Sequence, residues 1–331
     1  MSLLDNIYVI NMDKSTDRLS GMTSQIEVMG KPFVRIPAIV GKDLSSQEVQ
    51  EFTTGSCNYF CTSSMIGCFL SHKKAWQACI DNGDKYCMIL EDDCKLVDTF
   101  QQDLNNCTDE LSKIDPQWDF LYLGCLGACD LSHDYDLIGT ALKLFNPNII
   151  KKLNVDAKYV FIPESPAGFQ SYVISQECAR KMIGFMDKVD YHVDISFLKH
   201  SESFNIYACI KTIGMQYSTV GNSSQTESFP IMINSLADNF KCKKGTSYSY
   251  YLSCPVFGIG KFNVNVYLLV LLAIAIALPN KYRYHFSLLI FSYFLLEMAI
   301  KPINYEYAMF WSLCILAILG IKFSVPVIRD W

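Results

Sequence analysis

Three consecutive carboxylates, Glu91, Asp92 and Asp93, follow directly after the apolar run Tyr86–Leu90. Bringing three acids together costs mutual repulsion and desolvation, and a divalent cation would cancel much of that charge. Carboxylate oxygens favour a hard ion such as Mn2+ or Mg2+, which commonly links one or two carboxylates to the phosphates of a substrate. The triplet therefore indicates a metal site. The alternative is a solvated acidic turn, which the triplet alone does not exclude.

The segments before the triplet predict the elements that position it. A strand is expected at Asn6–Asn11, a helix over Ser15–Met29, and a second strand in FVRIPAI, an order typical of a doubly wound parallel sheet. Ser63–Ile80 carries apolar residues at helical spacing and leads straight into the strand that ends at the acids. The carboxylates would then lie at the carboxyl end of a strand, where open α/β sheets bind their ligands.

The alternation of strands and helices continues downstream. Three further strands are expected in the apolar runs WDFLYLG, FQSYVIS and FNIYACI, and another helix in ECARKMIGFM. Residues 221–228, GNSSQTES, are small and polar, which is typical of a mobile loop over a site. The pattern predicts a fold of the α/β class.

The composition of the chain changes in its last quarter. Residues up to about Cys254 mix charged, polar and apolar types, whereas the chain from Val264 onward is mostly apolar. We therefore expect two domains, a catalytic domain at 1–255 and a hydrophobic region at 256–331. The formal net charge of -5, with no basic stripe, excludes nucleic acid as a partner but not small anionic ligands.

Three apolar blocks make up the hydrophobic region: Val264–Leu278, Phe286–Ile300 and Tyr307–Ile321. Each is slightly shorter than the roughly 20 residues that span a bilayer, but aromatic and basic residues at the borders are typical of membrane anchors. We expect two or three transmembrane helices there. The alternative is a small buried helical subdomain, which Glu297 within the second block favours.

The side of the membrane depends on the charges around these blocks. Lysines before the first block, and the lack of an apolar signal sequence at the start, favour a catalytic domain on the cytosolic side. Lys281 and Arg283, between the first two blocks, favour the lumenal side instead. We expect a membrane-associated protein with its catalytic domain on the cytosolic side.

The chain has fourteen cysteines, most of them within apolar segments. Two pairs have the spacing C-x3-C, Cys57 with Cys61 and Cys125 with Cys129, but neither has a nearby histidine or the tighter spacing of a zinc knuckle. A chain of this length can build a core without disulfides, so free thiols are the expected state. The redox compartment stays open.

Six short motifs occur in order along the chain: IYVINMDKSTDRLSGM, GCFLSHKKAW, ILEDD, WDFLYLG, SYVIS and YHVDISF. Six ordered patterns are a far more specific signal than one acidic triplet. Their order resembles that of glycosyltransferase family 25, which includes bacterial lipooligosaccharide sugar transferases and collagen galactosyltransferases. The similarity covers about Asn6–Ile210 and leaves out the apolar blocks.

The resemblance implies a GT-A type α/β domain that binds a nucleotide sugar, usually a UDP-sugar, together with Mn2+ or Mg2+. It implies inverting transfer of a hexose such as galactose or glucose. Glu91 and Asp93 would be the metal ligands, with Asp92 close by. Asn11 and Arg18 resemble residues on the donor side, although an ordinary ion pair on a helix would also explain Arg18.

The resemblance also implies roles for two residues outside the triplet. His72, on the helix before the metal strand, would contact donor or acceptor, or would brace the strand as a structural histidine. Inverting transfer needs a base for the acceptor hydroxyl, and Asp194 in HVDIS is our candidate, ahead of Asp190 and Glu227. The alternative role for Asp194 is to cap the segment that follows it.

Two functions from different classes are compatible with these patterns. The first is a metal-dependent, inverting transferase held at a membrane, whose acceptor is a glycan, a lipid-linked glycan or a protein. The second is a degenerate nucleotide-sugar-binding module that recruits partners. Retention of a repulsive acidic cluster favours the enzyme. A transporter is a weaker third idea, because the short apolar blocks leave little material for a substrate path.

Overall fold

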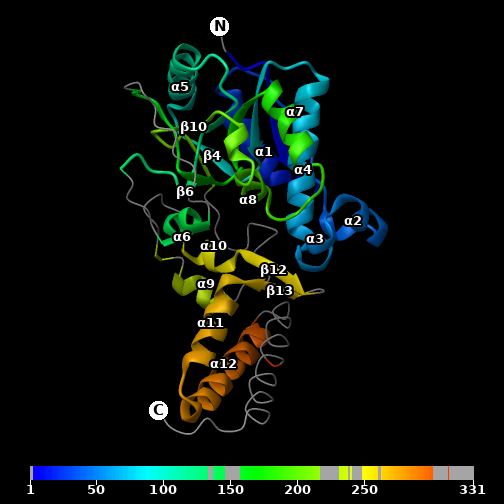
Figure 1. The fold of residues 1–331 in the computed structure, drawn as a ribbon, viewed down its shortest axis with the longest axis vertical. Coiled ribbons are helices and arrows are strands. Elements are labelled where there is room, and N and C mark those ends of the chain that lie inside the picture. Colours follow the sequence, from blue (N-terminus) through cyan, green and yellow to red (C-terminus); the bar gives the residue numbers. More distant parts are fainter. Residues whose placement is uncertain are drawn as a thin grey trace. The chain divides into compact units, whose positions relative to one another are not determined.

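The computed structural model in Figure 1 describes residues 3–132, 137–145, 157–216, 231–237, 239–240, 248–259, 262–300 and 312. The chain divides into two compact units, Met1–Tyr217 and Ser218–Trp331, which we call unit 1 and unit 2. The predicted boundary, between 255 and 256, lies inside unit 2.

Unit 1 is built around a mixed seven-stranded sheet. Five strands run in one direction, and β9 and β7 run in the opposite one. In spatial order the strands are β2 (Val34–Pro37), β1 (Asn6–Asn11), β3 (Tyr86–Glu91), β9 (Ser171–Ser175), β5 (Phe120–Tyr122), β10 (Ile206–Cys209) and β7 (Val160–Phe161). Two short antiparallel pairs lie outside it, β4 (Cys94–Leu96) with β11 (Gly214–Gln216) and β6 (Leu126–Ala128) with β8 (Ser165–Ala167).

Helices cover both faces of this sheet. The described helices of unit 1 are α1 (Thr16–Glu27), α2 (Ser46–Phe52), α3 (Gly55–Phe60), α4 (Ser63–Asp81), α5 (Phe100–Ile114), α6 (Leu137–Phe145), α7 (Gln176–Phe185) and α8 (Val193–Leu198). Side chains alternate along each strand, so Tyr8 and Ile89 pack with α4, α7 and α8, whereas Ile7 and Met88 pack with α1 and α5. The result is a three-layer α/β/α unit, in which α4 and α7 lie side by side (Figure 1).

The predicted α/β class is confirmed, and most of the predicted elements are present. The first strand matches its predicted bounds, and the helix that precedes β3 ends only one residue beyond its predicted end at Ile80. The sheet is not purely parallel, as the prediction had it, because β9 pairs antiparallel with both β3 and β5. An apolar run followed by a helix fixes neither the direction of a strand nor its neighbours.

Two glycines set the position of α4, the helix that carries His72. A Cβ atom at Gly41 would lie 1.8 Å from the carbonyl oxygen of Ser63, and one at Gly67 would lie 2.5 Å from that of Ile39. Only glycine allows the start of the helix to approach the 39–41 backbone so closely. Gly67 opens the motif GCFLSHKKAW, so the motif encodes the packing of the helix as well as its chemistry.

Unit 2 combines helices with a hairpin. Its described elements are α9 (Ile231–Ala237), α10 (Tyr248–Ser253), β12 (Pro255–Ile259), β13 (Phe262–Asn265), α11 (Val266–Ala277) and α12 (Asn280–Ile300). Ile233 and Leu252 pack on the same cluster as Leu268 and Phe294. Residues well before the predicted boundary therefore belong with the apolar helices, because they share a core with them.

The structure does not support the predicted transmembrane helices in the first two apolar blocks. Within the described part of the chain, no helix combines the length and the apolar character needed to cross a bilayer. α11 has 12 residues, about 18 Å, against a hydrocarbon core of about 30 Å. α12 has 21 residues but includes Lys281, Arg283 and Glu297. The third block lies outside the described residues except for Ser312.

The prediction of free thiols is wrong for four cysteines. Cys57 and Cys61 form one disulfide, with Cα atoms 4.6 Å apart, and Cys125 and Cys129 form another, with Cα atoms 5.9 Å apart. Both separations lie in the range that a disulfide bridges. Cys57 lies in α3 and Cys61 directly follows it, so one helical turn brings them together. None of the other eight described cysteines forms a disulfide within the part of the chain that the structure describes.

Candidate active site

The three acids lie where β3 ends, as the sequence predicted. Glu91 is the last residue of β3, and Asp92 and Asp93 form the turn that leads into β4. The backbone holds this turn on both sides, because the amide of Glu91 donates to the carbonyl of Gln170 and that of Asp92 to the carbonyl of Ile10. The acids are therefore fixed at the ligand-binding edge of the sheet.

Asp92 is held by two donors from the first motif. Arg18 Nη1 lies 3.1 Å from its Oδ1, and Asn11 Nδ2 donates to its Oδ2 at 2.7 Å. Asn11 is itself buried and accepts from Arg35 Nε at 2.8 Å, while Arg35 also pairs with Asp13. Burial raises the pKa of Asp92, although Asn11 and Arg18 lower it in part. The predicted donor-side residues thus converge on the acidic turn.

Asp93 is the least satisfied of the three acids. Its Oδ2 accepts from Gln216 Nε2 at 2.8 Å and lies 3.7 Å from Arg18 Nη1. Its Oδ1 is buried and has no hydrogen-bond partner among the residues that the structure describes. Burial and the nearby carboxylate of Glu91 raise the pKa of Asp93 to about 7. An orphaned carboxylate oxygen beside two other acids is what a cation site requires before its ion is bound.

Glu91 is connected to a buried chain of polar side chains. Its Oε1 lies 3.1 Å from Nε2 of His72, whose side chain is only 1% exposed. Nδ1 of His72 lies 3.0 Å from the hydroxyl of Tyr172, which accepts from Trp76 Nε1 at 2.9 Å. Trp76 can only donate and a carboxylate accepts, so the imidazole is oriented from both of its nitrogens. His72 therefore braces Glu91, as one of its two predicted roles requires.

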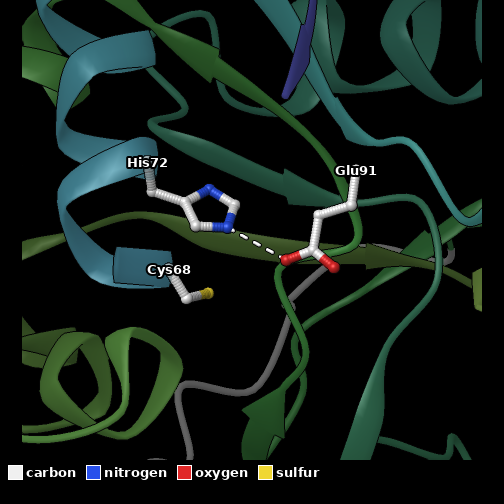
Figure 2. Close-up of side chains that lie close together, drawn as sticks. All are labelled: Cys68, His72 and Glu91. Carbon is white, nitrogen blue, oxygen red and sulfur yellow. Dashed lines mark hydrogen bonds and ion pairs between the residues drawn. The ribbon is translucent and has the colours of Figure 1, made fainter. Parts of the chain in front are cut away.

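A thiol completes a second group of potential metal ligands. The ligand atoms of Cys68, His72 and Glu91 all lie within 4.8 Å of one another. Cys68 is half-buried and, like His72, belongs to α4, whereas Glu91 comes from β3; Figure 2 shows the three side chains pointing toward one another. Burial and then the charges of Glu91, Asp194 and Asp93 raise the pKa of the Cys68 thiol.

Asp194 is another acid whose charge helps to raise the pKa of the Cys68 thiol. Asp194 is in the first turn of α8, and its Oδ1 accepts from the amide of Ile195 at 2.9 Å. Its Oδ2 accepts from the amide of Gly168 at 3.1 Å. Gly168 has φ of +91°, a conformation that favours glycine, so β8 is shaped to present this donor. The amides of Gly168 and of the next residue, Ile195, orient the carboxylate. Asp194 does not cap α8, because the N-cap position is occupied by His192.

The sequence analysis missed several residues that surround these groups. Cys68 precedes His72 by four residues and so lies on the same helical face, a signal that could have been read from the sequence. Tyr172 and Trp76 looked like ordinary core residues. Gln216 is 123 residues from Asp93, and no sequence pattern indicated their contact. The predicted loop at 221–228, with the alternative base Glu227, lies outside the described residues.

The arrangement can hold a divalent cation and a phosphate-bearing ligand. Asp93 Oδ1 and the Glu91 carboxylate supply hard oxygen ligands, and Asp92 is already paired with Arg18 and Asn11. The chemistry of the donor set therefore fits the predicted Mn2+ or Mg2+, with Glu91 and Asp93 rather than Asp92 as ligands.

Comparison with known proteins agrees with what the geometry of the site indicates. The family description "Glycosyltransferase family 25 (LPS biosynthesis protein)" matches residues 4–197, more than half of the 331-residue chain. A "Glycosyltransferase 25 family member" of Anopheles gambiae is 30% identical over 129 residues, which cover 37% of this chain and 22% of that protein.

Two mouse relatives cover similarly small parts of their own length. "Procollagen galactosyltransferase 2" of Mus musculus is 24% identical over 209 residues, 59% of this chain and 31% of that protein. "Inactive glycosyltransferase 25 family member 3" of Mus musculus is 24% identical over 128 residues, 36% of this chain and 22% of that protein. The chain spans between a fifth and a third of the length of these relatives. The matched segment holds the acidic turn and every residue around it except Gln216, and the chain belongs to glycosyltransferase family 25.

Proposed function

We propose that unit 1 is a metal-dependent glycosyltransferase that moves a sugar from a UDP-sugar to an acceptor hydroxyl with inversion at the anomeric carbon. The observation that carries the proposal is the buried Oδ1 of Asp93, next to Glu91 at the carboxyl end of β3, which has no hydrogen-bond partner among the described residues. Membership of family 25 supports the transferase activity.

Glu91 and Asp93 would hold Mn2+ or Mg2+. When bound, such an ion supplies Lewis-acid stabilisation of the charge that develops on the departing nucleotide. The chain's own part is to keep both carboxylates in place: His72 orients Glu91, and Gln216 orients Asp93. Because burial disfavours the charged form of Asp93, a cation would stabilise the ionised carboxylate and would compete with a proton for it.

Arg18 and Asn11 form the donor side of the site. Arg18 reaches both Asp92 and Asp93, so its guanidinium lies at the acidic turn, where the diphosphate would meet the cation. A guanidinium can keep one carboxylate partner and still donate to a phosphate oxygen, because it carries five N–H groups. Asn11 fixes Asp92, which in turn fixes Arg18.

Asp194 is the proposed general base. The amides of Gly168 and Ile195 orient its carboxylate. Its charge helps to raise the pKa of the Cys68 thiol, as do the charges of the proposed metal ligands Glu91 and Asp93. A carboxylate with two oriented oxygens can still accept the proton of an acceptor hydroxyl, because each oxygen has a second lone pair. Asp190 is a weaker candidate, since it pairs with Lys199 and Ser196.

The sugar and the acceptor follow only from the relatives. One mouse relative is named a procollagen galactosyltransferase, and the family description refers to lipopolysaccharide biosynthesis. Galactose or another hexose is therefore the first donor sugar to test, with hydroxylysine peptides and glycan acceptors as the two acceptor classes.

The two disulfides bear on the compartment. Disulfides persist in oxidising compartments and are rare in the cytosol. Cys57–Cys61 and Cys125–Cys129 therefore favour a lumenal or extracellular unit 1 over the cytosolic side that the charge pattern indicated. Alkylation of the protein from its natural source, before and after reduction, tests this: four additional alkylated thiols after reduction would support it, and none would contradict it.

The test of the proposed function measures UDP release from a panel of UDP-sugars. Purified protein should release UDP in the presence of Mn2+ and an acceptor, and chelation should stop the reaction. Asp194→Asn should lower turnover by about 100-fold or more while Mn2+-dependent UDP binding stays unchanged. Asp109→Asn, at an exposed site on α5, is the matched control and should turn over as the wild type does.

The same experiment separates the enzyme from the binding module. Mn2+-dependent UDP binding without turnover on any sugar or acceptor would favour the module, a relevant outcome because one relative is named inactive. Turnover that persists under chelation would contradict the metal dependence.

A further inference from the structure

We infer that Cys68, His72 and Glu91 form a second metal site, selective for Zn2+ or a similarly soft divalent ion, distinct in its ligands from the oxygen-only site proposed at Glu91 and Asp93. One sulfur, one nitrogen and one oxygen ligand converge from two rigid elements, α4 and β3, with all ligand atoms within 4.8 Å of one another (Figure 2). Thiolate and imidazole ligands favour Zn2+ over Mn2+ or Mg2+.

The geometry needs only small movements to close around an ion. In a tetrahedral zinc site the metal lies about 2.0–2.3 Å from each ligand atom, so the ligand atoms lie roughly 3.5 Å apart. Nε2 of His72 and Oε1 of Glu91 are 3.1 Å apart already. Cys68 and His72 are four residues apart on α4 and therefore share one face of the helix. A shift of about 1 Å at the Cys68 side chain brings the three ligands into range.

The surroundings of His72 also suit a metal ligand. A ligating histidine usually donates its second N–H to a fixed acceptor, which sets its orientation. Nδ1 of His72 lies 3.0 Å from the hydroxyl oxygen of Tyr172, and Trp76 Nε1 fixes that oxygen by donating to it. With an ion on Nε2, the proton of the imidazole moves to Nδ1 and is donated to Tyr172. The hydroxyl proton of Tyr172, which points to Nδ1 while that nitrogen accepts, turns away from the imidazole in this tautomer.

Two of the three ligand side chains are partly exposed. The side chain of Glu91 is 25% exposed, and Cys68 is half-buried, whereas His72 is enclosed. Three protein ligands leave one position for water or substrate, as in catalytic rather than structural zinc sites.

The two sites share Glu91, which predicts their interplay. Zinc at Cys68 and His72 would take Glu91 away from the ion that binds with Asp93, so zinc should inhibit in competition with Mn2+. This consequence depends on the proposed function, whereas the existence of the site does not.

The test uses Co2+ as a spectroscopic substitute for Zn2+ on the full-length protein, without any sugar donor. The wild type should bind one Co2+ with absorption from thiolate-to-cobalt charge transfer, and Zn2+ should displace it. Cys68→Ser should lose the charge-transfer band and bind Zn2+ about 100-fold more weakly. Cys254→Ser, which removes another half-buried thiol outside unit 1, should behave as the wild type.

Three outcomes would overturn the inference. These are absence of the charge-transfer band in the wild type, its persistence in Cys68→Ser, or equal Zn2+ affinity of wild type and Cys68→Ser. Retained Mn2+-dependent UDP binding by Cys68→Ser shows that the variant is folded. If turnover is measurable, Zn2+ should inhibit the wild type at lower concentrations than Cys68→Ser. If no turnover is found, the proposed function fails while the spectra still decide the zinc site.

Discussion

Unit 1 and unit 2 each contain a carboxylate with a buried oxygen atom, and the two carboxylates differ in their hydrogen-bond partners. Glu297 in α12 is fully buried, but its Oε1 accepts from the hydroxyl of Tyr293 at 2.6 Å and from the amide of Met232 at 2.8 Å. Asp93 is partly buried, with 13% of its side chain exposed, and its Oδ1 has no partner among the described residues. Burial and the charge of Glu91 raise its pKa to about 7.

The difference separates a structural acid from one that waits for a ligand. The donors to Glu297 come from its own helix and from α9, so the carboxylate joins two elements of unit 2. Asp93 joins nothing through its second oxygen, and its neighbours include other acids. An unsatisfied buried acid lowers stability unless something binds to it, which is the signature expected of a functional site.

The largest expected effect comes from Asp93→Asn. The amide keeps the size of the side chain and can still accept from Gln216, but it removes the charge that a cation needs. Turnover should fall roughly 100- to 1000-fold, since metal coordination contributes several kcal/mol to transition-state stabilisation. Melting of the metal-free protein should be unchanged or slightly higher, because a repulsive charge is lost. Steady-state UDP release measures the expected loss of turnover, and thermal melting measures the expected stability. Turnover of the variant equal to that of the wild type would mean that Asp93 is not part of the site.

Glu297→Ala should give the opposite pattern. The substitution leaves the partly buried hydroxyl of Tyr293 and the amide of Met232 without this acceptor, at a cost of about 2–4 kcal/mol in the free energy of unfolding. Denaturant unfolding measures that loss. UDP binding by unit 1 in the presence of Mn2+ should stay as in the wild type. Unchanged stability would mean that Glu297 is not the structural acid that its contacts indicate.

The features of the two units that could be predicted from the sequence are those encoded by a local pattern of residues. Periodicity located α4 and β3 almost to the residue, because apolar spacing along one segment is local. The position of the acidic turn at the end of a strand was also predicted, whereas the contacts of Asn11 and Arg18 with Asp92 were not, because the sequence indicated only that both resemble donor-side residues.

Non-local contacts were not predictable in this way. Apolar composition placed Glu297 in a predicted membrane span, whereas its partners lie in α9 and in its own helix. The contact of Gln216 with Asp93 and the direction of β9 arise from distant chain segments. The Cys57–Cys61 disulfide depended on the end of α3, a short helix whose bounds were not predicted.

Addition of Mn2+ tests the difference between Asp93 and Glu297 by its effect on the melting temperature, without a measurement of activity. An ion that binds only the folded protein stabilises it by about 2.7 kcal/mol at 100 times its dissociation constant. The wild type and Glu297→Ala should show equal increases in melting temperature for unit 1, and Asp93→Asn should show none. An increase in Asp93→Asn as large as in the wild type would place the ion elsewhere.

The smallest predicted effect concerns the chain of side chains behind Glu91. Tyr172→Phe removes the hydroxyl between His72 and Trp76 and leaves the imidazole held only at Nε2. Loss of such an outer contact typically weakens metal binding 10- to 100-fold, and we expect about tenfold for Mn2+ because the histidine orients a ligand without being one. Titration of Mn2+ against UDP release measures it: the apparent metal affinity should fall while turnover at saturating Mn2+ stays close to that of the wild type. If the hydroxyl acts only through Glu91, saturating Mn2+ restores turnover. A loss of turnover that saturating Mn2+ does not restore would mean that Tyr172 instead supports the fold of the sheet.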